Sequence, residues 1–165
     1  MKVYLSPSDQ PGMGVGTYGT EGYRMQQLSN KVKAALIALG HDVYGSDNTL
    51  SLAQRVAASN AANVDVHIAL HSNAGGGTGP EIWHYPNSTN GILLSNCIIT
   101  EVANVQGCPP SRGLKSNSTY WDLLGTVAPA AILEVGFHDN AYDAQWIVNN
   151  MDDIAQAIAE GIDAY

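Results

Sequence analysis

Apolar residues recur along this chain with two different spacings, which predict strands alternating with helices. Short runs of β-branched and aliphatic residues predict strands at 2–6, 43–44, 64–70, 81–85 and 130–137. Spacings of three and four between apolar residues predict a helix at 21–39 and an inner stripe in the last of two helical pieces within 141–165. We expect two further helices at 50–62 and 88–105. This order is typical of the α/β class. We therefore expect a mostly parallel, twisted sheet of five or six strands with helices on both faces.

Residues at the ends of these segments support the same division. Gly40 is a natural C-terminal stop for the first long helix, and Thr49 can cap the start of the second. Residues 106–118 contain Pro109 and Pro110, so we expect a loop there. No repeat, linker or low-complexity stretch divides the chain, and its 165 residues fit one domain spanning 1–165.

Composition and charge exclude several classes of function. With 45% hydrophobic and 13% charged residues, the chain is not expected to be disordered. A net charge of -8 argues against a nucleic-acid partner and against docking onto an anionic membrane. No apolar run is long enough to span a bilayer, and the N-terminus lacks the apolar stretch of a signal peptide. Cys97 and Cys108 are too few for a disulfide scaffold, and a bond between them is the less favoured alternative.

Two histidines on one strand-like segment are candidates for chemistry. His67 and His71 are four residues apart, a spacing that on a helix would suit a two-histidine zinc pair. In a strand, four residues span about 13 Å, so one metal ion cannot take both. We therefore favour His71 alone, beside the glycine-rich loop 75–79. The structural alternative for His71 is a hydrogen bond to the loop backbone.

Glu134 stands within a segment that otherwise reads as core, Ala130 to Phe137. Burying a carboxylate costs several kcal/mol unless a metal, a cation or a hydrogen-bond donor compensates it. One interpretation is a structural ion pair with Arg55 or Arg112. The other is a general base at the end of a buried strand.

Four further residues have both structural and functional interpretations. Glu21 opens the first long helix, where a carboxylate complements the helix dipole. Asp9 follows the first strand, where turn chemistry accounts for it. His84 and His138 each lie at the end of a predicted strand, and either could approach a site.

Taken together, these segments resemble the zinc-dependent N-acetylmuramoyl-L-alanine amidases of bacterial autolysins and phage endolysins. The resemblance covers nearly the whole chain. Its most specific blocks are His71-Ser72-Asn73-Ala74 and Leu133-Glu134-Val135-Gly136-Phe137, and further matches are Val3-Tyr4-Leu5-Ser6-Pro7, Leu52-Ala53-Gln54-Arg55, Ala62-Asn63-Val64-Asp65, Gly79-Pro80-Glu81-Ile82-Trp83 and Arg112-Gly113.

The resemblance implies a zinc site and its ligands. It makes His71 and Glu21 zinc ligands and Glu134 the catalytic acid and base. The chain departs from the family where a first-strand histidine usually follows Asp-Pro-Gly, because Ser6-Pro7-Ser8-Asp9 stands there. Asp9 aligns with the missing histidine, and an aspartate oxygen can bind zinc. Gln10, His84 or water are the alternatives for this position.

The expected activity is hydrolysis of the bond between N-acetylmuramic acid and L-alanine in peptidoglycan, by a zinc-activated water. Asn73 and Arg112 are expected to position the substrate. The alternatives are a degenerate, wall-binding module on the same fold, or hydrolysis of another amide. We expect a monomer that is made in the cytoplasm and acts on the cell wall after lysis-dependent release.

Overall fold

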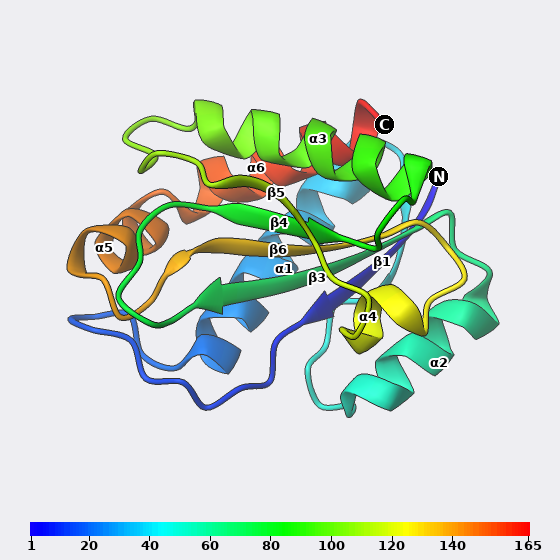
Figure 1. Ribbon diagram of the computed structural model, residues 1–165, viewed down its shortest axis with the longest axis horizontal. Helices are drawn as coiled ribbons and strands as arrows, with labels where there is room; N and C mark the ends of the chain where they lie inside the picture. The colour runs from blue at the N-terminus through cyan, green and yellow to red at the C-terminus, as the bar shows by residue number, and fades with distance from the viewer.

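Six strands form one sheet at the centre of the molecule (Figure 1). The computed structural model describes residues 1–165. The strands are Lys2–Pro7 (β1), Asp42–Gly45 (β2), Val66–Asn73 (β3), Glu81–His84 (β4), Gly113–Ser116 (β5) and Ala130–Phe137 (β6). Their order in the sheet is β2-β1-β3-β6-β4-β5. Every neighbouring pair is parallel except β4 and β6, so the expectation of a mostly parallel α/β sheet is confirmed.

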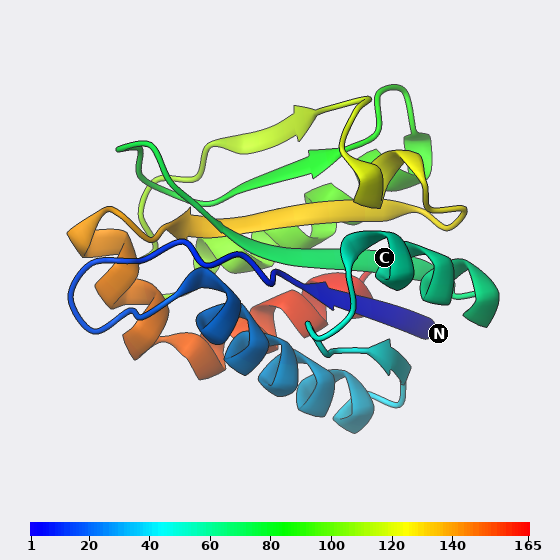
Figure 2. The ribbon, with the colours of Figure 1, turned by 90° about the horizontal axis from the view of Figure 1, so that it is seen from below.

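Six helices cover the two faces of the sheet unequally (Figure 2). They are Glu21–Ala38 (α1), Leu52–Ala62 (α2), Thr89–Asn104 (α3), Trp121–Leu124 (α4), Ala141–Asn149 (α5) and Met151–Asp163 (α6). Leu70 and Leu133 of the sheet join a core of 28 buried residues with α1, α3, α5 and α6. Their neighbours Ala69 and Ile132 point to the opposite face, where only 4 residues cluster, including Leu123 of α4. The second face is therefore thinly covered.

The sequence misplaced or missed three local features. The cap of α2 is Ser51 rather than Thr49, because Ser51 and Gln54 form a reciprocal capping box. The predicted loop 106–118 contains the edge strand β5, which pairs with β4, and the short helix α4 follows it.

Cys97 and Cys108 are not bonded to each other. No helix has the length and apolar character needed to cross a membrane.

The carboxyl ends of β3 and β6 meet beside the start of α1. His71 and Glu134 are register partners on these parallel strands, and a bulge follows between His71 and Asn73. Thr20 caps α1 through its side chain, and the backbone N–H of Glu21 donates to the carbonyl of Gly12. The fold thereby brings Glu21, His71 and Glu134 to one edge of the sheet, where ligand sites of such sheets collect.

Candidate active site

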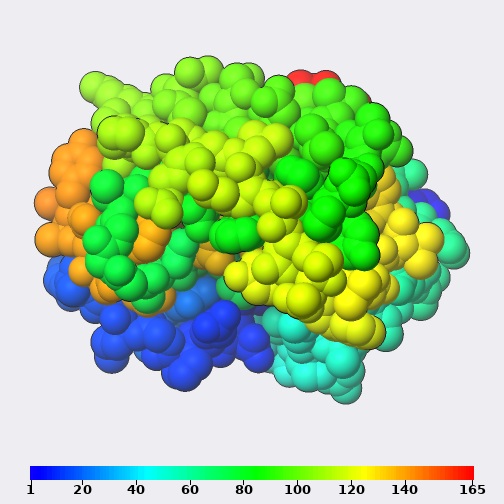
Figure 3. All heavy atoms as spheres, in the orientation of Figure 1, coloured from blue at the N-terminus to red at the C-terminus, as the bar shows by residue number.

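A cavity of about 300 Å³ lies at this edge of the sheet. Its lining residues are Gln10, Gly12, Glu21, His71, Ser72, Asn73, Ala74, Glu134 and His138. The face in Figure 3 shows a hollow between the blue N-terminal segment, the green loop after β3 and the yellow region of α4. A larger cavity of about 510 Å³, next to α4 and the start of α3, is lined by no histidine, carboxylate or basic side chain. The smaller cavity therefore carries the candidate chemistry.

Glu21 and His71 are in direct contact within the cavity. Oε1 of Glu21 lies 3.0 Å from Nδ1 of His71, and the Glu21 side chain is almost completely buried. Burial alone would lower the pKa of His71, but the hydrogen bond with Glu21 and the charge of Glu134 raise it above its ordinary value. Glu21 thus does more than complement the dipole of α1.

Glu134 lies next to this pair without a partner of its own. Its Oε2 is buried and accepts no hydrogen bond. Burial raises the pKa of Glu134 to about 7, the charge of His71 opposes this rise, and Glu21 and Glu81 add to it. The structural ion pair considered for Glu134 is absent, because Arg112 pairs with Glu81 and Arg55 pairs with Asp9. Of the two interpretations of Glu134, the general base is the one that stays open.

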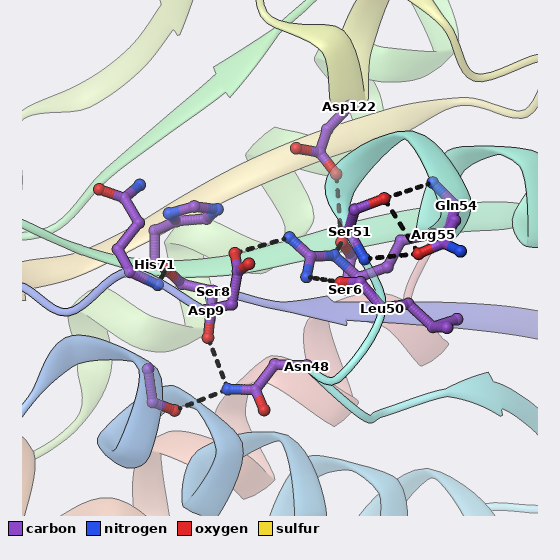
Figure 4. Close-up of polar contacts among 12 residues, drawn as sticks. Ser6, Ser8, Asp9, Asn48, Leu50, Ser51, Gln54, Arg55, His71 and Asp122 are labelled. Atoms are coloured by element: carbon purple, nitrogen blue, oxygen red, sulfur yellow. Dashed lines mark hydrogen bonds and ion pairs between the residues drawn. The ribbon is translucent and has the colours of Figure 1, made fainter.

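Asp9 departs from the expected arrangement. It does not line the cavity, and its Oδ1 accepts a hydrogen bond from Nη2 of Arg55 at 3.2 Å (Figure 4). Arg55 is 2% exposed and also donates to Ser6 and to the carbonyl of Leu50. A buried guanidinium needs an anion nearby, and this requirement accounts for the position of Asp9.

The predicted substrate residues form a chain through Glu81. Nδ2 of Asn73 donates to Oε1 of Glu81 at 3.0 Å, and Nε of Arg112 donates to Oε2 at 2.6 Å. Asn73 lines the cavity, whereas Arg112 is partly exposed and lies over the ring of Phe137. Glu81 was assigned no role from the sequence, yet it links the two residues and faces Glu134 across the β4–β6 pair.

Of the other candidates, His138 lies in the cavity and His84 does not. His84 pairs with Ala131, three positions before Glu134 along β6, and Nδ1 of its ring bonds to the carbonyl of Tyr85. His138 lines the cavity directly after β6. Gln10 also lines it. The sequence signal for His138 was its place at a strand end, four residues after Glu134, but nothing in the sequence alone separated it from His84.

A second histidine–carboxylate cluster is built from His67, four residues before His71. Nδ1 of His67 bonds to Oγ of Ser59, and its Nε2 bonds to Oδ1 of Asp122, each at 3.0 Å. Asp122 also accepts from Ser6. Burial alone would raise the pKa of Asp122, but the hydrogen bond and charge of His67 lower it below its ordinary value. All members of this cluster are buried and partnered.

The residues of the cavity suit a zinc ion. Zinc takes imidazole nitrogen and carboxylate oxygen, the two atom types that His71 and Glu21 present 3.0 Å apart. A Cβ on Gly12 would lie 3.1 Å from Nε2 of His138 and 3.5 Å from Oε2 of Glu21, so the glycine leaves this space open. In the present conformation no three histidine, cysteine or carboxylate side chains enclose a common point. His71 and Glu21 are therefore the two candidate ligands that this conformation brings into contact.

Comparison with known proteins identifies the family. The profile described as N-acetylmuramoyl-L-alanine amidase matches residues 8–164. The chain belongs to this family. The amidase CwlM of Bacillus licheniformis is 34% identical over 174 residues, covering 98% of this chain and 65% of that protein. A sporulation-specific amidase of Bacillus subtilis is 27% identical over 173 residues, which again cover 98% of this chain and 65% of that protein. The chain thus spans just under two thirds of the length of these amidases.

The fold of the amidase family is also found in solved structures. The amidase AmiC2 of Nostoc punctiforme superimposes with a TM-score of 0.89 at 20% identity, covering 100% of this chain and 96% of that chain. The catalytic domain of the CD27L endolysin superimposes with a TM-score of 0.85 at 21% identity, covering 99% of this chain and 97% of that chain. At such identities the likeness concerns the fold.

Proposed function

We propose that this chain is a zinc-dependent peptidoglycan amidase that hydrolyses the bond between N-acetylmuramic acid and L-alanine. Family membership supports the reaction, and one observation in the cavity carries the mechanism. A carboxylate oxygen of Glu134 is buried without a donor beside the Glu21–His71 pair. Such an atom costs free energy in a folded protein, and a proton-transfer role explains why it is kept.

Glu21 and His71 are the proposed metal ligands, and Glu134 is the proposed general base and acid. Zinc held by these residues would supply Lewis-acid activation of the attacking water and of the scissile carbonyl. Glu134 accepts the proton of the attacking water and then delivers it to the nitrogen of the departing alanine. In the protein without metal, burial raises the pKa of Glu134 to about 7, so its surroundings favour the protonated form that the second step needs.

Asn73 and Arg112 are the proposed substrate-positioning residues. Glu81 holds both side chains, so their orientation is fixed before substrate arrives. The guanidinium of Arg112 keeps donors free for a carbonyl or carboxylate of the stem peptide, because only its Nε bonds to Glu81.

The test combines metal removal with product analysis. Chelator-treated protein should lose release of stem peptides from purified peptidoglycan and regain it on addition of zinc. Mass spectrometry of the soluble products should find peptides that begin with a free L-alanine amine. Undiminished cleavage by protein whose metal content is verified as nil would remove zinc from the proposal, and peptides cut at another bond would remove the stated substrate bond.

A wall-binding module without catalysis is the second candidate. The observation in its favour is that Asp9, aligned with a family zinc ligand, pairs with Arg55 instead of lining the cavity. A pure binder would sediment with peptidoglycan but release no peptide, with or without zinc. A monomeric state and lysis-dependent delivery to the wall stay predictions.

A further inference from the structure

His138 lines the same cavity as Glu21 and His71. Its backbone N–H donates to the carbonyl of Asn73, and its own carbonyl accepts from the N–H of Val15. Its ring packs against the ring of Tyr18 with centroids 5.7 Å apart. The residue is 4% exposed, and it lines the cavity.

The hydrogen bonds of the ring assign its tautomer. Nδ1 of His138 lies 3.0 Å from the backbone carbonyl oxygen of Ser72, an atom that can only accept. Nδ1 therefore carries the proton. Oγ of Ser72, 2.9 Å from Nδ1, receives its own hydrogen bond from the hydroxyl of Tyr18 at 2.6 Å. The lone pair of the neutral ring is consequently on Nε2, which has no partner within the protein.

This arrangement is the one that orients metal-binding histidines. A ligating histidine almost always donates its other ring N–H to a carbonyl or carboxylate, which fixes the tautomer and the direction of the free nitrogen. Here the free nitrogen and Oε2 of Glu21 both lie within 3.5 Å of the position that a Cβ on Gly12 would occupy. The other oxygen of the same carboxylate contacts His71. One oxygen of Glu21 therefore contacts His71, and the other lies near the same point as Nε2 of His138.

We propose that Nε2 of His138 is the third protein ligand of the zinc site, in the role that the sequence assigned to Asp9. The resulting donor set, two histidines and one glutamate, is one that catalytic zinc sites of other hydrolases use. Asp9 instead neutralises Arg55, so the chain supplies from the end of β6 what its first strand lacks. The inference rests on the proposed zinc dependence but makes a separate statement about which residue binds the metal.

Cysteine substitution with cobalt as the probe tests this assignment directly. The variants are His138→Cys and, as the matched alternative, Asp9→Cys, each made in the full chain and loaded with Co²⁺. A thiolate bound to cobalt gives a near-ultraviolet charge-transfer absorption, which a residue with a merely structural role cannot produce. The unsubstituted protein provides the baseline, because it already contains Cys97 and Cys108.

The charge-transfer band should appear in His138→Cys and be absent from Asp9→Cys. The opposite pattern, or a band in neither variant while the unsubstituted protein binds cobalt tightly, overturns the assignment of His138 and leaves zinc dependence intact. Failure of the unsubstituted protein to bind zinc or cobalt overturns both proposals.

Two measurements do not depend on the cysteine variants folding. X-ray absorption of the unsubstituted zinc protein should require two imidazole ligands, and a fit with one imidazole contradicts the proposal. Zinc affinity, measured by competition with a chromophoric chelator, should fall by more than about 100-fold in His138→Ala, since even loss of an orienting partner costs 10- to 100-fold. Asp9→Ala should change that affinity by less than about 10-fold.

Discussion

Strand β3 carries two histidine–carboxylate clusters that differ in how completely their polar atoms are partnered. His67 is bonded at both ring nitrogens, to Ser59 and to Asp122. Around His71, by contrast, a buried oxygen of Glu134 has no partner and the ring of His138 directs an unpaired nitrogen into a cavity. Both clusters place a histidine beside a carboxylate, but His67 and Asp122 are buried whereas His71 and Glu134 are partly exposed.

We take this difference to distinguish a structural site from the proposed reactive one. A buried polar network that is fully satisfied rigidifies the fold, whereas an unsatisfied buried group destabilises it unless a ligand completes it. Histidine and carboxylate in contact are therefore a weak signal by themselves. The unpaired atoms and the open space beside them mark the cluster of His71, and each prediction below changes one side of this contrast.

The largest effect is expected from Glu134→Gln. Removing the proposed base should lower kcat by about 10²- to 10⁴-fold, because the amide cannot accept the proton of water. Zinc content should be unchanged, and thermal stability should be equal or higher, since a buried ionisable group is removed. Peptide release and metal analysis on the same preparation check both points. Full activity in this variant would eliminate Glu134 as the base.

Asp122→Ala is expected to act on stability instead. The change leaves Nε2 of His67 buried without a partner and should cost about 3 kcal/mol of the free energy of unfolding. The zinc affinity of the folded variant should stay within a few-fold of that of the unsubstituted protein. Denaturant titration gives the free energy, and Asp152→Ala at an exposed surface pair is the matched control, expected to cost less than about 1 kcal/mol. Equal losses in the two variants would contradict the structural role of the buried cluster.

Opposite dependences on pH are expected from the two clusters in chelator-treated protein. The pKa of Asp122 is lowered in the folded state, so its contribution to stability is present above its ordinary value of 3.8 and is lost as pH falls through the lower value. The pKa of Glu134 is raised from 4.5 to about 7, so its contribution is present below 4.5 and is lost as pH rises toward about 7.

Thermal unfolding measured between pH 3 and pH 8 separates the two losses of stability, the acid limb at low pH and the neutral limb between pH 4.5 and about 7. Glu134→Gln should flatten the loss of stability between pH 4.5 and about 7 while leaving the acid limb in place, and Asp122→Asn should flatten the acid limb. His71 has a raised pKa and adds to the loss above 6.5, so a small slope should survive in Glu134→Gln. A variant that alters the other limb would refute the assignment.

The smallest effect is expected from Arg112→Ala. Because the guanidinium is partly exposed and lies outside the cavity lining, its loss should raise KM several-fold and change kcat less. Lys115→Ala on the neighbouring strand β5 is the control for a simple loss of positive charge. Steady-state kinetics on soluble peptidoglycan fragments measure both. A fall in kcat alone would move Arg112 from substrate positioning to the chemical step.

The sequence predicted most of the fold because its segments carry strong periodic signals. β6 was predicted with the bounds that it has, since Ala130 to Phe137 is a buried run interrupted only at Glu134. β5 was missed because a four-residue edge strand beside two prolines carries no periodicity of its own. Ser51 displaced Thr49 as the cap of α2 because Gln54 completes the box, a detail of side-chain geometry.

The candidate site was predicted only in part. Glu134 could be singled out because a carboxylate in an apolar strand conflicts with burial, and that argument needs no three-dimensional information. The position of Asp9 could not be predicted, because it depends on how Arg55 of α2 is buried against Ser6 of β1. His138 was visible as a strand-end histidine, but its hydrogen bond to Ser72 follows from the β3–β6 register and appears only in the folded chain.

The order of strands in the sheet has a consequence for how the molecule comes to be built. β3 and β4 follow each other in the chain, yet β6 lies between them and is the last strand to be synthesised. A nascent chain cannot close its sheet until that strand has been threaded into the middle, and such distant pairing is slow. Because the same strand carries Glu134, the candidate site cannot form before the chain has been synthesised as far as β6.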